Sequence, residues 1–305
     1  MKIIAALKEG FKAKAEGLVE TPTKPTIHPR PGCLLRALPG YLKKADISGL
    51  KWVSAYPSNT AQGLPLTSGL VILNDSKTGL PNAIIEGTRI TAWRTAGVST
   101  IAAQLLARPG ASTLALCGAG VQGRTHLDFL VTALPGLKRV QVFDTNPAAL
   151  DHFLAKQGAN HPRLEIAAAL SAMEAVQGAD IIITAAPMPE KRLAILRAGD
   201  IAPGTLSLPL DLDSYFDPSG FMVQDLIFSD DPAQVEAFQS QGRFEDVKVL
   251  AGDYGNLLTG ARPGRTDESQ RIMAISIGTA VGDLIIADMI CRRAFSQGLG
   301  QMLEL

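Results

Sequence analysis

The residues best suited to chemistry form a glycine-rich turn between two apolar runs. The run 113–116 leads into a G-x-G-x-x-G hexapeptide, and an amphipathic segment and a second β-branched run follow. Glycines at this spacing are a weak signal in a loop, but between a strand and a helix they form the fingerprint of dinucleotide binding. They permit a tight turn, close approach of the backbone to a pyrophosphate, and close helix packing. The hexapeptide comprises Gly118, Ala119, Gly120, Val121, Gln122 and Gly123.

The end of the second apolar run predicts which dinucleotide binds. Asp144 lies 21 residues after Gly123, where a carboxylate accepts hydrogen bonds from the ribose diol of NAD and repels the 2′-phosphate of NADP. Thr145 follows, with no Arg or Lys beside it. The amide groups of the helix that starts near Val121 favour a diphosphate. We therefore expect NAD as the cofactor; the alternative is a tight turn that binds no nucleotide.

Other polar residues are candidates for substrate binding and proton transfer. Lys51 lies in an apolar strand, where its ammonium either extends to solvent or acts on a substrate. Arg94 is expected in the first turn of a helix, where a cation is unfavourable and indicates an anionic partner. Arg30 lies among prolines, either solvated or clamping a carboxylate. Asp211 and Asp213 follow an expected strand, at the sheet edge where ligands bind, with loop capping as the alternative.

Two kinds of sheet, one antiparallel and one of alternating strands and helices, are expected to position these residues. Residues 49–87 predict antiparallel strands with a hairpin turn at 74–79, and a helix is expected over 91–107. After residue 110, strands and helices alternate as in a doubly wound α/β sheet, with strands that include 205–210 and 221–228. A long apolar helix or a pair of helices is expected over 267–297.

Composition excludes several classes of function. The chain has 305 residues, enough for two domains, and a net charge of +0, which gives no electrostatic footprint for nucleic acid or an anionic membrane. Its three scattered cysteines indicate a reducing compartment, and its four histidines lack metal-ligand spacing, so we expect no metal. The N-terminal apolar run is too short for a signal peptide, and no window is long enough for a membrane span. We expect a cytoplasmic protein whose partner is a small molecule.

Three blocks of the sequence resemble the ornithine cyclodeaminase/mu-crystallin family. They are the strand text that begins LKWVSAYPSN, the motif EGT-x-x-T-A-x-R-T-A joined to LALCGAGVQG, and APGRTDESQRIMAISIGTAVGD near the C-terminus. The resemblance implies an α/β fold in which a Rossmann NAD-binding domain spans residues 111–271. It implies a second, α+β domain for substrate binding and dimerisation, formed by residues 1–110 and completed by C-terminal helices over 272–305.

The resemblance also implies roles for individual residues. Lys51 matches the active-site lysine of the family, Arg94 its carboxylate-binding arginine, and Asp211 its catalytic aspartate. Arg30 matches a second arginine that binds the substrate. Two features depart from the family pattern: Ser207-Leu208-Pro209-Leu210 replaces a glycine-rich lead-in to Asp211, with Asp213 as a second acid, and Leu66 stands where cyclodeaminases have threonine.

These residues and the resemblance agree on a class of reaction. We expect an NAD-dependent enzyme that transfers hydride at the Cα–N centre of a small amino acid or imine, as amino acid dehydrogenases and ketimine reductases do. The alternatives are a true ornithine cyclodeaminase and a non-catalytic, mu-crystallin-like binding protein. Leu66 in the pocket would disfavour ornithine, although Asp213 could bind its side-chain ammonium. Open sheet edges and the family predict a homodimer.

Overall fold

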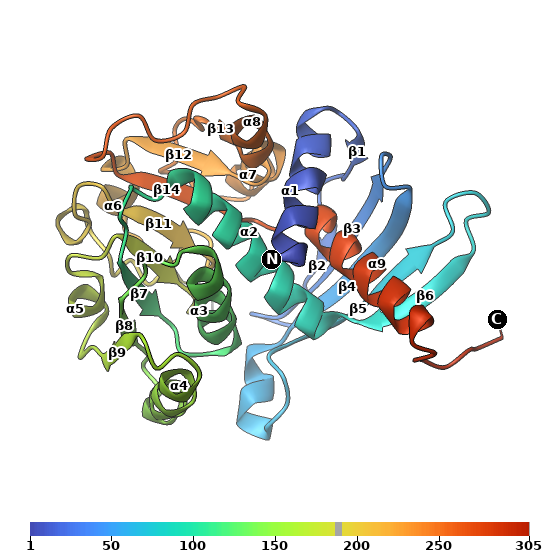
Figure 1. Cartoon of the computed structure of the whole chain (residues 1–305), viewed down its shortest axis with the longest axis horizontal. Helices are drawn as coiled ribbons and strands as arrows, with labels where there is room; N and C mark the ends of the chain where they lie inside the picture. The colour runs from blue at the N-terminus through green and yellow to red at the C-terminus, as the bar shows by residue number, and fades with distance from the viewer. Residues whose placement is uncertain (187–190, 305) are drawn as a thin grey trace. The chain divides into compact units, whose positions relative to one another are not determined.

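The computed structural model describes residues 1–186 and 191–304, which form two compact units (Figure 1). One unit comprises Thr95–Gly278 with Met1–Ile4, and we call it the parallel-sheet unit. The other comprises Ala5–Arg94 and the segment from Thr279 to the C-terminus, and we call it the antiparallel-sheet unit. The sequence predicts domain boundaries at residues 110 and 272, and these boundaries remain a prediction.

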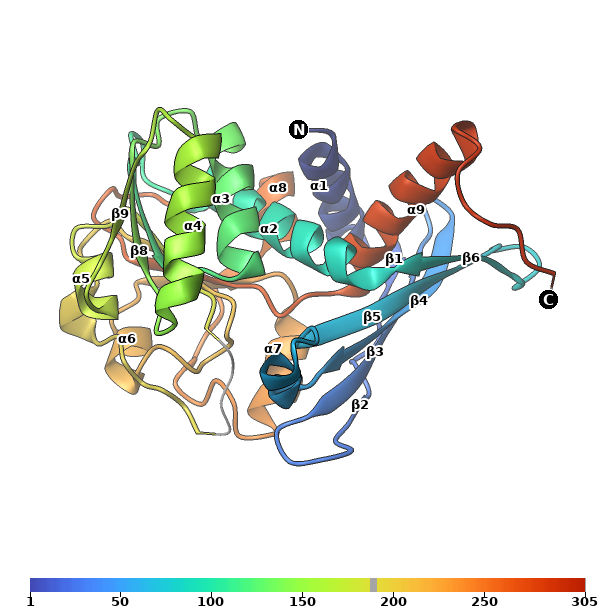
Figure 2. The same cartoon turned by 90° about the horizontal axis from the view of Figure 1, so that it is seen from below.

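The antiparallel-sheet unit is a six-stranded sheet with order β1-β3-β4-β5-β6, in which β2 also pairs with β3. Figure 2 shows α1 and α9 on one side of this sheet. The predicted hairpin is confirmed as β5 and β6. The elements are α1 (Lys2–Ala15), β1 (Val19–Glu20), β2 (Thr26–Ile27), β3 (Leu34–Leu42), β4 (Ile47–Ala55), the 3₁₀-helix η1 (Pro57–Gln62), β5 (Thr67–Asn74), β6 (Pro81–Glu86), the start of α2 (Gly87–Leu106), and α9 (Ala280–Ser296).

Two glycines bring α9 close to this sheet. Gly40 on β3 and Gly49 on β4 lie opposite each other in the ladder. A Cβ atom on Gly40 would lie 2.8 Å from the Cβ of Ala280, and one on Gly49 would lie 3.0 Å from a methyl carbon of Leu284. Larger residues would push α9 away, since packed interiors have no spare volume. Asp283, which lies between Ala280 and Leu284 on α9, is therefore held against the face of β4.

The parallel-sheet unit is built on eight strands, all parallel, in the order β13-β12-β14-β11-β10-β7-β8-β9. The order reverses between β7 and β10, as in doubly wound folds, where ligands bind at the carboxyl ends of the strands. The elements are β7 (Thr113–Cys117), α3 (Val121–Ala133), β8 (Arg139–Phe143), α4 (Pro147–Asn160), β9 (Glu165–Ala168), α5 (Ala172–Val176), β10 (Ile181–Thr184), η2 (Ala198–Asp200), β11 (Leu206–Pro209), α6 (Pro218–Met222), β12 (Leu226–Ser229), α7 (Pro232–Gln239), β13 (Gly252–Asp253), α8 (Tyr254–Thr259) and β14 (Ile272–Ile275). The predicted fold class is confirmed.

Two predicted elements are wrong over part of their length. The strand expected over 221–228 is shorter, because Asp217 caps a helix through the amide of Gly220 at 2.8 Å and Pro218 starts that helix, so Phe221 is helical. The helix expected from residue 267 starts only at Ala280. Its first part contains β14, whose four residues are buried between β11 and β12. A short apolar run fits a buried parallel strand as well as a helix.

The helix expected over 91–107 begins earlier than predicted. Its first residue is Gly87, and the carboxylate of Glu86 accepts hydrogen bonds from the amides of Thr88 and Arg89 at 2.5 and 3.2 Å. These bonds satisfy amides that the first helical turn leaves without partners. Arg94 consequently lies two turns inside α2, and the argument that placed it in the first turn is wrong.

None of the helices in the described ranges is long and apolar enough to cross a lipid bilayer.

Candidate active site

Lys51 is the centre of a buried charged cluster in the antiparallel-sheet unit. Its side chain, 1% exposed, points from the middle of β4, and its ammonium donates to Asp283 Oδ1 at 2.7 Å and to Thr91 Oγ1 at 3.4 Å. Arg94 Nε lies 3.3 Å from the same oxygen of Asp283. The cluster therefore joins β4, α2 and α9 through three charged groups. The sequence predictions for Lys51 and Arg94 converge on one place.

The environment of Lys51 makes its amine titrate closer to neutral pH than a free lysine. Burial lowers its pKa to about 8; Asp283 opposes this shift, and the positive charges of Arg94 and Arg36 add to it. A lysine in this range can hold an anion or exchange a proton with it.

Two buried polar atoms of this cluster have no hydrogen-bond partner among the described residues. They are Asp283 Oδ2 and Arg94 Nε, whose approach to Asp283 has ion-pair distance without hydrogen-bond geometry. Buried polar groups are nearly always paired, so such atoms are expected where a polar ligand binds. The cluster therefore offers one acceptor atom, Asp283 Oδ2, and one donor atom, Arg94 Nε, to a polar ligand.

Asp283 was missed by sequence reasoning. It lies in the apolar run Ala280–Ala287 of α9 and is fully buried. A single acid inside an apolar helical face is itself a signal, because a carboxylate is almost never fully buried without a partner. The position of its cation on β4 is a tertiary fact that the sequence does not carry.

Arg30 and Leu66, also predicted to bind substrate, are not part of this cluster of contacts. Arg30 is exposed in a turn closed by the amide of Cys33 and the Arg30 carbonyl at 3.0 Å, and its guanidinium makes no ion pair within the described chain. The carbonyl of Leu66 accepts from the Tyr56 amide at 2.8 Å and so extends the ladder of β4 and β5 by one pair. Strand alternation then directs Leu66 to the sheet face opposite Lys51. The pocket role of Leu66 loses its support.

The glycine motif of the parallel-sheet unit fits a dinucleotide. Gly118 follows β7 with a φ of +127°, and a Cβ atom there would lie 2.7 Å from the Ala185 carbonyl at the end of β10. A Cβ atom on Gly120 would meet no atom within 4 Å, so the space beside it is open. Gly120 is also the N-cap of α3 and supplies no capping side chain. The amides that open α3 are thus available to a diphosphate at the strand-order reversal.

Asp144 is fixed beside this turn. Its two carboxylate oxygens accept hydrogen bonds from the amides of Ala119 and Asn146 at 2.7 and 2.8 Å. Each oxygen keeps a lone pair for a further donor, such as a ribose hydroxyl. Thr145 beside it is exposed. The geometry fits the NAD-type recognition expected from the sequence.

Asp211 lies just beyond β11 and is 1% exposed. Its Oδ1 accepts from the Thr184 hydroxyl at 2.8 Å, whereas Oδ2 is buried without a partner in the described part of the chain. Burial raises the pKa of this carboxyl to about 7, against the opposing effect of the Thr184 hydrogen bond. A carboxyl that titrates near neutral pH is suited to proton transfer.

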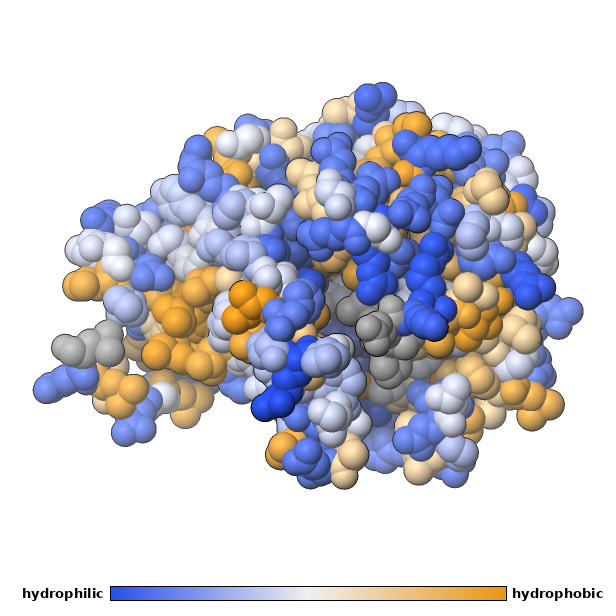
Figure 3. All heavy atoms as spheres, turned by 180° about the vertical axis from the view of Figure 1, so that it is seen from behind, coloured by the Kyte–Doolittle hydropathy of each residue, from blue (hydrophilic) through white to orange (hydrophobic). Residues whose placement is uncertain are grey.

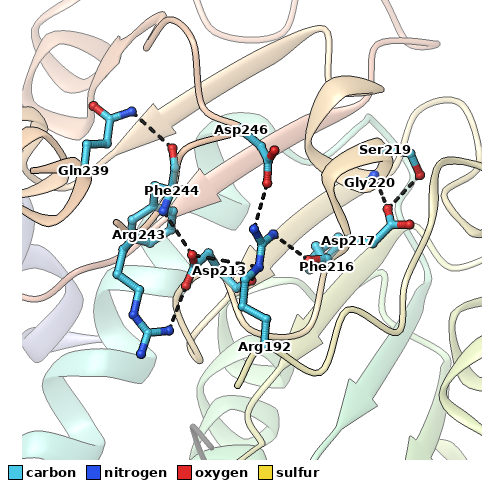
Figure 4. Close-up of polar contacts among 10 residues, drawn as sticks. All are labelled: Arg192, Asp213, Phe216, Asp217, Ser219, Gly220, Gln239, Arg243, Phe244 and Asp246. Carbon is cyan, nitrogen blue, oxygen red and sulfur yellow. Dashed lines mark hydrogen bonds and ion pairs between the residues drawn. The ribbon is translucent and has the colours of Figure 1, made fainter. Parts of the chain in front are cut away.

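Asp213 has a different environment from Asp211, although two residues separate them. Leu212 between them has a φ of +60°, a left-handed conformation that turns the chain. The Asp213 carboxylate accepts from Arg243 at 3.1 Å and from the Phe244 amide at 3.0 Å (Figure 4). Both oxygens are thus engaged in the protein, which gives no support to the predicted role of Asp213 as a partner for a substrate ammonium.

Arg192 links the segment around Asp213 to the segment that contains Asp246. Its guanidinium donates to the carbonyls of Asp213 and Phe216 at 2.9 and 3.0 Å and to the Asp246 carboxylate at 2.9 Å (Figure 4). Charge-assisted bonds of this kind hold loops in place. Asp213 therefore acts as a structural link within the parallel-sheet unit, two residues after Asp211. Within the described residues, no group of three or more His, Cys, Asp or Glu side chains is arranged to hold a metal ion.

Comparisons with known proteins identify the fold and the family of this chain. The chain is 31% identical over 295 residues to the nodulation efficiency protein NfeD of Rhizobium meliloti, covering 94% of this chain and 88% of that protein. Its fold is similar to that of Thermococcus litoralis Δ1-pyrroline-2-carboxylate reductase in complex with NADH and L-proline, with a TM-score of 0.89, 26% identity and coverage of 99% and 95%. An archaeal alanine dehydrogenase dimer with bound NAD has a TM-score of 0.87, 25% identity and coverage of 99% and 94%. The family model for ornithine cyclodeaminase and mu-crystallin matches residues 1–298, so this chain belongs to the ornithine cyclodeaminase/mu-crystallin family.

Proposed function

We propose that this protein is an NAD-dependent enzyme that transfers hydride at the Cα–N centre of a small amino or imino acid. The observation that carries the proposal is the buried cluster of Lys51, Arg94 and Asp283, which has cationic groups for a carboxylate and unpaired polar atoms. The similar proteins in complex with NADH and L-proline, or with NAD, support the same class of reaction.

Each polar group has a distinct role in this proposal. Arg94 and Lys51 bind the α-carboxylate by charge-assisted hydrogen bonds, with Arg30 as a further candidate, and so orient the α-carbon. Asp283 holds Lys51 and Arg94 in position. Asp211 exchanges a proton with the substrate nitrogen as the C–N bond changes between amine and imine. When bound, NAD accepts the hydride from the α-carbon, or NADH returns it.

The cofactor is proposed to lie on the glycine turn. Gly118 permits the tight turn after β7, Gly120 leaves room for the diphosphate, and the first amides of α3 bind it. Asp144 binds the adenosine ribose and disfavours a 2′-phosphate.

A homodimer is part of the proposal. Trp52, Leu70 and Ile84 are 39%, 48% and 58% exposed, and the strand register places them on the sheet face opposite Lys51. Figure 3 shows apolar side chains gathered on the corresponding side of the antiparallel-sheet unit. An exposed apolar patch of this kind is typical of a protein interface. The dimeric archaeal relative supports this assignment.

The test combines cofactor binding with turnover. NADH and NADPH are titrated by fluorescence, and kcat/KM is then measured for keto acids with ammonium or methylamine, for cyclic ketimines and for ornithine. We expect tight NADH binding and the highest kcat/KM for imine reduction. Failure to bind either dinucleotide would overturn the proposal. Highest activity in converting ornithine to proline would identify a cyclodeaminase, and bound cofactor without turnover a binding protein.

A further inference from the structure

Thr279 is buried at the N-terminus of α9 with an unused hydroxyl group. It is the N-cap residue of this 17-residue helix, with a φ of −124° and a ψ of 164°. An N-cap threonine ordinarily accepts a hydrogen bond from an amide of the first turn, but the Thr279 side chain makes no such bond. The residue is 5% exposed, and its Oγ1 is buried without a hydrogen-bond partner in the described part of the chain. A buried hydroxyl in this state is unusual and points to a ligand that pairs with it.

The first turn of α9 places Thr279 next to the Lys51 cluster. Asp283 follows Thr279 by four residues, and side chains at this spacing are neighbours on one face of a helix. Gly282 precedes Asp283, and a Cβ atom on Gly282 would lie 3.1 Å from Arg94 Cβ and 3.6 Å from Arg94 Cδ. The missing side chain therefore lets the stem of Arg94 lie against this turn. All five residues belong to the antiparallel-sheet unit.

Three of the unpartnered polar atoms within the described residues belong to this group. They are Thr279 Oγ1, Arg94 Nε and Asp283 Oδ2. A hydroxyl and a guanidinium can both donate to a carboxylate, whereas a carboxylate oxygen such as Asp283 Oδ2 requires a donor such as an N–H group. An α-amino acid carries both kinds of group. The amides that Thr279 leaves uncapped, and the positive end of the helix dipole, also favour an anion at this turn.

We propose that the Thr279 hydroxyl donates a hydrogen bond to the α-carboxylate of the substrate, beside Arg94 at the N-terminus of α9. This inference rests on the proposed function, because it adds a residue to the carboxylate site of that function. Thr279 then differs from an ordinary N-cap, whose hydroxyl stabilises the helix. The buried hydroxyl of Thr279 lowers the stability of the protein without ligand, and it contributes affinity when the ligand is bound.

The test measures stability and ligand binding in a Thr279→Val variant. Valine has nearly the shape of threonine without the hydroxyl, so the variant without ligand should unfold at the same or a higher urea concentration. Calorimetry, with and without NADH, measures the binding of L-proline and of cyclopentanecarboxylate, which has the ring and the carboxylate but no amine. Both acids should bind more weakly by the same factor, roughly 10-fold or more, because a hydrogen bond to a charged group is lost. Thr279→Ser keeps the hydroxyl and should keep most of the affinity.

Thr205→Val is the matched control. Thr205 is 1% exposed, and its hydroxyl donates to the Ala179 carbonyl at 2.9 Å, so this variant should lose stability and keep its affinity for both acids. Unchanged affinity in Thr279→Val, or a loss of affinity that comes with a loss of stability, would overturn the inference.

Two further outcomes would also count against the role of Thr279. Weaker binding of L-proline alone would assign the hydroxyl to the amine, and failure of the unaltered protein to bind either acid would remove the carboxylate site. None of these measurements needs turnover. Absence of catalysis would therefore refute the proposed function, and the unfolding and binding data would still decide the role of Thr279.

Discussion

Asp283 Oδ1 lies 2.7 Å from Lys51 Nζ, although 232 residues separate the two in the sequence. The contact is possible because α9 packs on β3 and β4 at Gly40 and Gly49. Both side chains are almost completely buried, at 1% and 0% exposure. Removing one partner of such a buried pair strongly destabilises the fold, because the remaining buried charge is then uncompensated.

Asp283→Asn should therefore impair both stability and activity. The carboxylate raises the pKa of Lys51, so its removal should shift that pKa further below about 8 and leave more neutral amine at pH 7. Breaking a buried pair costs about 3–5 kcal/mol, which should appear as a large drop in unfolding temperature. Urea unfolding and the pH profile of kcat/KM measure the two effects.

Asp288→Asn is the matched control for Asp283→Asn. Asp288 is on the same helix and pairs with the exposed Arg292 at 2.7 Å. An exposed pair contributes at most about 1 kcal/mol, so this variant should behave like the unaltered protein. Equal behaviour of the two variants would contradict the central role assigned to Asp283.

The sequence predicted the strand–turn–helix unit well because its signals are local. The glycine motif, β7, β8 and Asp144 all belong to one continuous stretch, and each residue type has its own steric reason. Lys51 and Arg94 were candidates from their positions in an expected strand and helix, and the family resemblance assigned their roles. By contrast, β14 was taken for helix, because four buried apolar residues carry no periodicity that separates a central strand from a helix.

The partners of charged residues were the least predictable part of the site. Asp211 and Asp213 have the same residue type and nearly the same position, yet the positive φ of Leu212 separates their environments. One carboxyl is left with an unpaired oxygen, and the other is engaged by Arg243 and Phe244. Asp283 joins the Lys51 cluster only through tertiary packing, which spacing in the sequence does not encode.

Gly120→Ala should weaken cofactor binding strongly while leaving the fold intact. The added methyl group meets no protein atom within 4 Å, so the apoprotein should accept it, but it would occupy the space assigned to the diphosphate. We expect NADH affinity to fall at least about 10-fold, since the backbone must approach the pyrophosphate closely. Gly158→Ala, also free of nearby atoms, is the control. Unchanged NADH binding by Gly120→Ala would place the cofactor elsewhere.

Asp144→Ser should change the choice between the two dinucleotides. The variant loses an acceptor for the ribose diol and the charge that repels a 2′-phosphate, so NADH should bind more weakly and NADPH more tightly. We expect the ratio of their dissociation constants to change roughly 10-fold or more. Asp151→Ser, an exposed change on α4, controls for net charge. Equal affinity of the unaltered protein for both dinucleotides would mean that Asp144 does not face the ribose.

Leu70→Lys should dissociate the proposed homodimer. Leu70 is 48% exposed and lies opposite Trp52 in the ladder of β4 and β5. A lysine there would bury a charge in an interface at a cost of several kcal/mol, while the exposed position should tolerate it in a monomer. Sedimentation of both proteins at micromolar concentration gives the readout. Leu80→Lys, on an exposed apolar residue of the hairpin turn, is the control. A monomeric unaltered protein would refute the dimer.

Asp211→Asn should remove one limb of the pH profile of activity. Burial raises the pKa of Asp211 to about 7. In imine reduction the protonated carboxyl of Asp211 donates a proton, so kcat/KM should fall above about pH 7. In amino acid oxidation the carboxylate accepts a proton, so kcat/KM should fall below about pH 7. Measuring both directions in the same enzyme should therefore give limbs of opposite sign. Asp128→Asn, an exposed change on α3, should keep both limbs.

The same group should also set a pH dependence of stability, which tests its burial independently of turnover. The ordinary pKa of an aspartate is 3.8, so between about pH 4 and 7 the unfolded chain has released a proton that the folded chain keeps. The folded state then binds more protons, and its stability must fall as pH rises through this window. At 1.36 kcal/mol per unit, the contribution is at most about 4 kcal/mol. Urea unfolding at pH 5 and pH 8 should show this difference in the unaltered protein and a smaller one in Asp211→Asn; equal differences would mean that Asp211 titrates as an exposed acid.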